Sequence, residues 1–104
     1  MGKYVLAYTG GAMAETEAAQ QEAMTQWMNW FGSLGESVVD AGNPFGPSAT
    51  VDSDGKVSDR GASGLSGYSI IDASSMGEAC DKANGCPVLT SGGAIEVYEA
   101  MPIG

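Results

Sequence analysis

The sequence predicts an α+β protein with a four-stranded antiparallel sheet, and three observations lead to this prediction. Short runs rich in β-forming residues alternate with two helical patterns, in the order strand, helix, strand, strand, helix, strand. An Asp-Gly turn signal between the two middle strands indicates an inserted β-hairpin. The chain of 104 residues is long enough for one modest core, so we expect a single domain over residues 1–104.

The first part of the chain predicts a strand followed by one long helix. Residues 3–9, KYVLAYT, are rich in β-forming residues and end at two glycines, which favours a first strand. From 15 to 34 the apolar residues recur at helical spacing, and Gly35 suits the left-handed position that ends a helix. Trp27 lies in the middle of the apolar stripe, so we expect it in the core. Trp30 lies at the edge, where it packs in the core or lines a cleft or a dimer contact.

A second strand and a hairpin are predicted next. Residues 36–42, ESVVDAG, favour a strand, and the NPFGP segment after them is typical of a turn because its prolines cannot donate to a β-ladder. Further on, Asp54 and Gly55 stand between Val51 and Val57. This arrangement predicts a hairpin with a two-residue turn, inserted before the next strand of the sheet.

The third strand of the sheet is predicted at residues 68–73, YSIIDA, after a glycine-rich approach. Gly61, Gly64 and Gly67 precede it at intervals of three residues. A phosphate-binding loop leaves a strand and opens a helix, whereas these glycines enter a strand. We therefore interpret them as positions that relieve crowding where the chain bends into the sheet.

The last part of the chain predicts a short helix and a final strand. Ser75 and Glu78 have the spacing of a capping box, and Gly85 followed by Pro87 ends the helix. The apolar stripe of this helix consists of Met76, Ala79, Cys80 and Ala83. Residues 94–99, AIEVYE, alternate between apolar and polar side chains, as the final strand of the sheet.

This order of elements is the split βαβ, or ferredoxin-like, pattern. It predicts a four-stranded antiparallel sheet with both helices on one face, plus the inserted β-hairpin. The other face would carry Tyr, Val and Ile side chains from several strands without cover. Because an uncovered apolar face is a liability on a small chain, we predict a homodimer in which a second copy covers it.

Composition excludes several classes of partner. Thirteen acidic and four basic residues give a net charge of -9, which opposes binding to nucleic acid or to anionic membranes. No apolar run reaches the roughly 20 residues of a membrane helix, and no secretory signal is recognised, so we expect a cytoplasmic protein.

A reducing compartment favours free thiols at Cys80 and Cys86, the alternative being a short-loop disulfide. With no histidine and no zinc-type cysteine spacing, we expect neither a metal nor a cofactor.

Asp40 is the carboxylate most suited to a functional site. It follows two valines at a strand end and precedes a glycine- and proline-containing loop, where sites are often built. The alternative is a solvated acid, or one that caps the turn amides beyond it. Glu96 and Glu99 fall on opposite faces of the last strand and so cannot act as a pair. The lack of histidine excludes Ser–His and Cys–His catalysis.

Several segments together resemble the YCII-related family, also called the DGPF-domain family. They are GLSGYSIIDASS, GEACDKANGCPVL and GGAIEVYEAMP, while KYVLAYTGG and WFGSLGESVVDAGNPFG fit the family's amino-terminal half. The resemblance covers nearly the whole chain and implies a dimeric α+β barrel, in which two ferredoxin-like units pack their sheet faces together. It also implies a histidine and aspartate pair for elimination or isomerisation chemistry, which falls near Met24 and Ser33 here. Residues 54–57 read DGKV where the family has DGPF, and Val88 replaces a histidine common after Cys-Pro.

Three functions are compatible with these observations. The first is a homodimer that binds a small apolar or aromatic molecule in a cleft between the sheet and the first helix, without histidine-based catalysis. Its candidate ligand-binding residues are Tyr8, Trp27, Asp40, Phe45 and Tyr68. The second is a small enzyme of lyase or isomerase type, with Asp40 as the base and a tyrosine as the proton donor. The third is an acidic regulatory protein that acts on a protein partner; the missing histidine favours a non-catalytic role.

Overall fold

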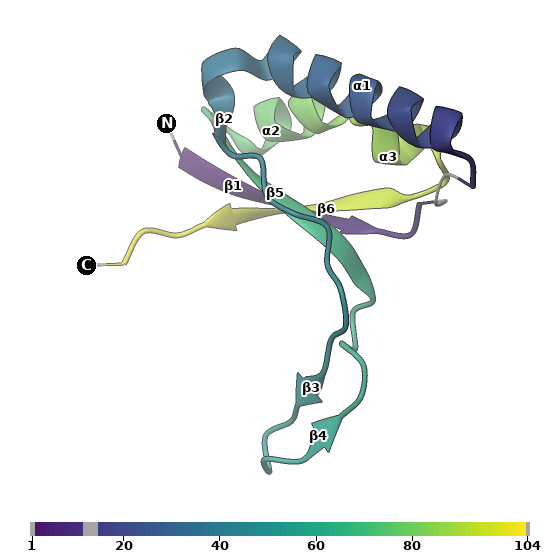
Figure 1. Cartoon of the computed structure of the whole chain (residues 1–104). Helices are drawn as coiled ribbons and strands as arrows, with labels where there is room; N and C mark the ends of the chain where they lie inside the picture. The colour runs from purple at the N-terminus through teal and green to yellow at the C-terminus, as the bar shows by residue number, and fades with distance from the viewer. Residues whose placement is uncertain (1, 12–14, 104) are drawn as a thin grey trace.

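The structure is a computed structural model that describes residues 2–11 and 15–103, and it is an α+β fold (Figure 1). One sheet has four antiparallel strands, namely β1 (Gly2–Thr9), β2 (Val38–Asp40), β5 (Leu65–Ala73) and β6 (Ala94–Ala100). The helices are α1 (Glu17–Leu34), α2 (Met76–Ala83), α3 (Pro87–Thr90) and the 3-10 turn η1 (Gly35–Ser37). A separate hairpin joins β3 (Thr50–Val51) to β4 (Val57–Ser58).

The strands of the sheet lie in the order β2-β5-β1-β6. Figure 1 shows α1, α2 and α3 together on one side of this sheet, and the β3–β4 hairpin projecting away from it on the other side. The prediction of an antiparallel sheet with its helices on one face is therefore confirmed. Among the described residues, the helices are too short or too polar to cross a membrane.

Strand alternation gives the sheet two different faces. The covered face, which packs against the helices, consists of Tyr4, Leu6, Tyr8, Ser69, Ile71, Ile95 and Val97. The open face consists of Lys3, Val5, Ala7, Tyr68, Ile70, Asp72, Glu96 and Tyr98. Most of the covered face is buried, whereas on the open face Val5 and Ile70 are half-buried and Tyr98 is 55% exposed. The Tyr, Val and Ile side chains predicted for this second face are present there.

Local signals explain the ends of α1. The Thr16 side chain accepts a hydrogen bond from the Ala19 amide, so the helix begins at Glu17, two residues later than the predicted Glu15. At the other end Gly35 has a positive φ of 57°, and its amide donates to the Phe31 carbonyl. The C-terminal prediction is therefore confirmed.

The burial of the two tryptophans is the reverse of the expected order. Trp30 is 6% exposed, and its indole N–H donates to the Lys82 carbonyl over 3.1 Å, which ties α1 to α2. One edge of Trp30 also borders a more open groove between α1 and α3. Trp27 is only half-buried and packs against the edge of the core. A core position for Trp27 is therefore only partly correct, because the face of α1 that meets α2 carries Trp30, whereas Trp27 lies beside the cleft.

The connection between α1 and β5 differs from its prediction. Residues 36–42 form only a three-residue strand, because the chain first makes the 3-10 turn η1. The inserted hairpin is present, but five residues separate Val51 from Val57, so its turn is longer than predicted. The Lys56 amide donates to the carboxylates of Asp52 and Asp54, which holds this longer turn together.

The second half of the chain follows its signals more closely. The Ser75 side chain accepts from the Glu78 amide, as the capping box predicts, while the Glu78 carboxylate reaches back to Ser74. The predicted break at Pro87 is correct, but this proline also starts α3, which was not predicted. The strand β5 begins at Leu65, three residues earlier than expected.

Close backbone approach explains two glycines beside β5. A Cβ on Gly67 would lie 3.1 Å from the Asn43 carbonyl oxygen, where the loop after β2 bridges to the strand. The crowding predicted for this glycine is confirmed. Gly42, which the sequence did not single out, is more constrained: its φ is +78°, and a Cβ there would lie 1.7 Å from the Tyr68 carbonyl oxygen. The segment 41–45 therefore runs against the edge of β5.

Candidate functional site

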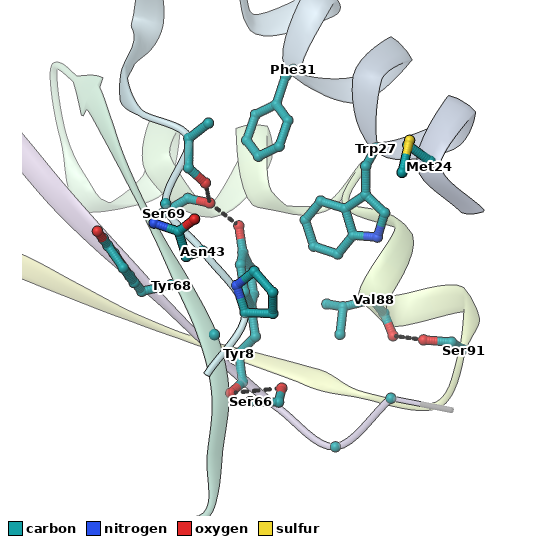
Figure 2. A pocket seen from close by; sticks show the side chains of 16 residues that line it. Tyr8, Met24, Trp27, Phe31, Asn43, Ser66, Tyr68, Ser69, Val88 and Ser91 are labelled. Carbon is teal, nitrogen blue, oxygen red and sulfur yellow. Dashed lines mark hydrogen bonds between the residues drawn. The ribbon is translucent and has the colours of Figure 1, made fainter. Parts of the chain in front are cut away.

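A cleft of about 490 Å³ lies between α1 and the covered face of the sheet. Residues of β1 and β5 form its floor, α1 forms one wall, and the segment 41–44 and α3 complete it (Figure 2). Its lining side chains and backbone come from Tyr8, Gly10, Gly11, Met24, Trp27, Phe31, Ala41, Gly42, Asn43, Pro44, Ser66, Gly67, Tyr68, Ser69, Val88 and Ser91. The location is the one predicted for a cleft between the sheet and the first helix.

Aromatic rings form the main apolar surface of the cleft. The Trp27 ring meets the Tyr8 ring edge-to-face, with 5.3 Å between centroids and an interplanar angle of 72°. The Phe31 ring lies 5.8 Å from Trp27 on the same wall, one helical turn further along α1. Met24 lies on that wall as well, and Val88 of α3 faces it. This surface suits a flat apolar molecule.

A chain of hydrogen bonds runs across the floor of the cleft. The Tyr8 hydroxyl donates to the Ser69 hydroxyl over 2.7 Å, and the Ser69 hydroxyl donates to the Ala41 carbonyl over 2.6 Å (Figure 2). The Ser66 hydroxyl donates to the Tyr8 carbonyl over 3.2 Å. These bonds fix the Tyr8 ring and join β1, β5 and the segment after β2 around one site.

The titratable groups near the floor stay neutral. Burial raises the pKa of Tyr8 far above its ordinary value, although its hydrogen bond with Ser69 lowers it in part. Burial also raises the pKa of the Cys86 thiol to about 11, against smaller lowering effects from the Val88 amide and the Tyr8 hydroxyl. No charged side chain occurs among the described residues that line the cleft. Near neutral pH the site therefore offers shape, aromatic surface and neutral hydrogen bonds.

The structure brings two of the five predicted site residues together in the cleft. Tyr8 and Trp27 are in contact there. Tyr68 borders the cleft through its backbone, but its side chain points to the open face, as Figure 2 shows. On that face the Tyr68 ring stacks on Phe45 at 5.7 Å, and its hydroxyl donates to Asp40 Oδ2 over 3.3 Å. The five residues predicted for the site therefore form two separate groups. Tyr8 and Trp27 lie on the covered face of the sheet, and the other three lie on the open face.

Asp40 has a local structural role. Its Oδ1 accepts a hydrogen bond from the Gly42 amide over 2.8 Å, so the side chain caps the turn that follows β2. The capping alternative considered from the sequence is thus the observed arrangement. The carboxylate lies outside the cleft that contains Tyr8 and Trp27.

Sequence reasoning did not identify several lining residues. Phe31 follows Trp27 by four residues, so helical spacing alone would place it on the same wall. Ser69 lies opposite Leu6 across the β1–β5 ladder and therefore shares the Tyr8 face, a relation that needs the strand register. Of the two positions that the family resemblance implied for a catalytic pair, Met24 lines the cleft, whereas Ser33 Oγ donates to the Trp30 carbonyl.

Cysteines and carboxylates form no metal-ligating group of three or more within residues 2–11 and 15–103. Both thiols are free: Cys80 is exposed on α2, and Cys86 is buried beside Tyr8. No protein-family model, no curated protein and no solved structure matches this chain.

Proposed function

We propose that this protein binds a small apolar or aromatic molecule in the cleft between α1 and the covered face of the sheet. The observation that carries the proposal is the cleft itself, with about 490 Å³ of space beside the Tyr8, Trp27 and Phe31 rings. Aromatic rings around a concave space are the usual lining of small-molecule sites. The lack of a charged group in the described lining favours binding over acid–base catalysis.

Tryptophan fluorescence and thermal shift test this proposal with naphthalene as a neutral aromatic probe. Because Trp27 lines the cleft and Trp30 is buried in the core outside the described lining, bound probe is expected to change mainly Trp27 emission and to raise the melting temperature. Trp27→Leu is expected to weaken binding by at least about tenfold, the loss of one aromatic contact surface. Unaltered emission and melting temperature at saturating probe would contradict the proposal.

Asp40→Asn provides the matched control and tests the enzyme alternative. Since Asp40 lies outside the cleft, the Asn variant is expected to bind naphthalene as the wild type does. An Asp40-dependent turnover of any bound compound would instead support a lyase or isomerase. No contact among residues 2–11 and 15–103 favours that function or a regulatory role on a protein partner.

We also propose that the open face packs against a second copy of this chain. Val5, Tyr68, Ile70 and Tyr98 give this face an apolar centre. Lys3 opposite Asp72, and Glu96 opposite Ala7 further along β1, supply both signs of charge. The β3–β4 hairpin projects on the same side, and Val51 and Val57 are 67% and 63% exposed on it. A two-stranded hairpin alone is marginal in water, so a partner surface would stabilise it.

Sedimentation at micromolar concentration tests this assembly. The wild type is expected to sediment as a dimer and Ile70→Lys as a monomer, because a buried lysine would oppose the contact. A stable wild-type monomer would contradict the homodimer. Naphthalene binding would then still stand, since the described cleft is formed by one chain.

The order of strands and helices bears on the fold of the proposed dimer and on its family. The strand order β2-β5-β1-β6, with one helix after β1 and others after β5, supports a ferredoxin-like split βαβ arrangement. Two such sheets packed through their open faces would make the dimeric α+β barrel of the YCII-related family. We therefore propose membership of that family, with 54–57 as its altered DGPF segment.

A further inference from the structure

We propose that the cleft selects neutral aromatic molecules that donate a hydrogen bond to the Tyr8 hydroxyl oxygen, and that it rejects carboxylates. This inference rests on the proposed function and specifies the chemical class of its ligand. Two independent observations carry it. One is the absence of charge among the described lining residues, and the other is the direction in which the cleft hydroxyls donate.

The charge distribution opposes an anionic ligand. The chain has a net charge of -9, and the described lining contains neither lysine nor arginine. A carboxylate that entered the cleft would lose hydration and find no cation to replace it. A neutral molecule of the same shape has no such cost.

Hydrogen-bond directions are fixed at the floor of the cleft. The Ala41 carbonyl can only accept, so the Ser69 hydroxyl is the donor in that bond. Because the Ser69 proton is already used in that hydrogen bond, the Tyr8 hydroxyl must be the donor in the bond between Tyr8 and Ser69. The Tyr8 oxygen keeps a lone pair and has no proton to offer. A ligand can hydrogen-bond to it without breaking the chain only by donating.

The protons of Ser66 and Ser91 are likewise used in hydrogen bonds to backbone carbonyls. Ser66 Oγ donates to the Tyr8 carbonyl, and Ser91 Oγ donates to the Val88 carbonyl over 3.0 Å. The hydroxyl oxygens of Tyr8, Ser66, Ser69 and Ser91 therefore act as acceptors toward the cleft, whereas the hydroxyl of Tyr68, the fifth such residue in the described lining, donates to Asp40 on the open face. The side-chain donors of the described lining are the exposed Asn43 amide and the Trp27 indole N–H on the α1 wall, while the weakly donating Cys86 thiol lies beside Tyr8. The floor thus matches an aromatic N–H or O–H group.

Three probes of similar shape test this selectivity by isothermal titration calorimetry. Indole carries an N–H donor, benzofuran has a ring oxygen in its place, and indole-3-carboxylate adds a negative charge. A net hydrogen bond to a neutral acceptor predicts that indole binds about 3- to 10-fold more tightly than benzofuran. The carboxylate is expected to bind at least about tenfold more weakly than indole.

Two variants assign the preference to Tyr8. In Tyr8→Phe the indole-to-benzofuran affinity ratio is expected to fall by about 3- to 10-fold, because the acceptor is gone. In Ser69→Ala the Tyr8 proton is released from its bond, so benzofuran is expected to gain affinity and the ratio to fall as well. The difference in hydration between the two probes is the same for every variant, so the change in ratio reports the contact alone.

The binding results distinguish a failure of the proposed selectivity from a failure of the proposed aromatic-binding function. If indole and benzofuran bind wild type equally, or if both variants keep the wild-type ratio, the donor rule is wrong and the aromatic-binding function stands. If the carboxylate binds as well as indole, the selection for neutral ligands is wrong. If naphthalene, indole and benzofuran all fail to bind, the proposed function falls together with the inference.

Discussion

Tyr8 and Tyr68 lie almost opposite each other on neighbouring strands, yet they belong to different sides of the protein. Tyr8 pairs with Gly67 across the β1–β5 ladder, and Tyr68 pairs with Ala7, one step along. The Tyr8 side chain is buried on the covered face, where its hydroxyl donates to Ser69. The Tyr68 side chain is half-buried on the open face, where its hydroxyl donates to Asp40. A single step of strand register thus separates a ligand-binding candidate from a surface cluster.

The segment 41–45 connects these two sides. It begins beside Asp40 on the open side, and the Ala41 carbonyl accepts a hydrogen bond from the Ser69 hydroxyl on the covered side. It ends at Phe45, which stacks on Tyr68. The same five residues therefore position the cleft floor and the open-face cluster, so damage to this segment should affect both.

Gly42→Ala is expected to cause the largest loss of stability, because it disturbs the cleft floor and the open-face cluster at the same time. The φ of +78° is unfavourable for alanine, and the new Cβ would lie 1.7 Å from the Tyr68 carbonyl oxygen. We expect a loss of more than about 3 kcal/mol in the free energy of unfolding, measured by urea denaturation. Gly32→Ala in α1 is the control: its Cβ meets nothing within 4 Å, and alanine should add about 1 kcal/mol of stability. Equal stabilities of the two variants would contradict the strained turn.

The two tryptophans should separate stability from binding on the covered side. Trp30→Phe leaves a gap in the core and removes the indole donor from the Lys82 carbonyl, so we expect a loss of about 2–3 kcal/mol. Trp27→Phe changes a half-buried ring and is expected to cost about 1 kcal/mol. Naphthalene binding should show the opposite order, with the larger loss in Trp27→Phe. Similar unfolding midpoints for both variants would contradict the assignment of Trp30 to the core.

Matched tyrosine variants test the comparison of the two faces directly. Tyr8→Phe leaves the buried Ser69 hydroxyl without its donor, which predicts a loss of about 1–2 kcal/mol. Tyr68→Phe removes an exposed bond of 3.3 Å and should stay within about 0.5 kcal/mol of wild type. Thermal unfolding at pH 7 measures both. An equal or larger loss for Tyr68→Phe would show that the open face is more tightly organised than the bond lengths indicate.

The buried Tyr8 hydroxyl also predicts how the stability of the protein changes at alkaline pH. Burial raises the pKa of Tyr8 above its value of 10.0 in the unfolded chain. The neutral hydroxyl therefore stabilises the fold below pH 10, and this contribution is lost as the pH rises above that value. Wild type should lose stability above pH 10 more steeply than Tyr8→Phe does.

Most of the secondary structure was predictable because its determinants are local. The Ser75 cap, the Gly35 terminus and the alternation of residues 94–99 each specify an element within a few residues. The 3-10 turn at Gly35–Ser37 and the helix α3 were not predicted, since each is a short turn whose stability depends on packing against the rest of the chain.

The candidate site was predictable only in part. Tyr8 and Trp27 were found because an aromatic residue in a strand and one in an amphipathic helix must meet where the two pack. The face of Tyr68 depends on its register with β1, and the place of Asp40 depends on the turn that it caps. Both are long-range or conformational facts, so sequence spacing could not separate these residues from the cleft.

The smallest expected effect concerns the carboxylate of Glu78 on the helical side of the sheet. Hydrogen bonds from Ser74, followed by the contact with Lys82 at 3.1 Å, lower the pKa of Glu78 below its ordinary 4.5. A lowered carboxyl pKa stabilises the fold above about pH 4.5, and that contribution disappears as the pH falls through the folded-state value. The melting temperature of wild type should therefore exceed that of Glu78→Gln at pH 7 and converge with it toward pH 3. Glu22→Gln removes the same charge from an exposed position on α1, so a similar convergence in that variant would assign the effect to net charge alone.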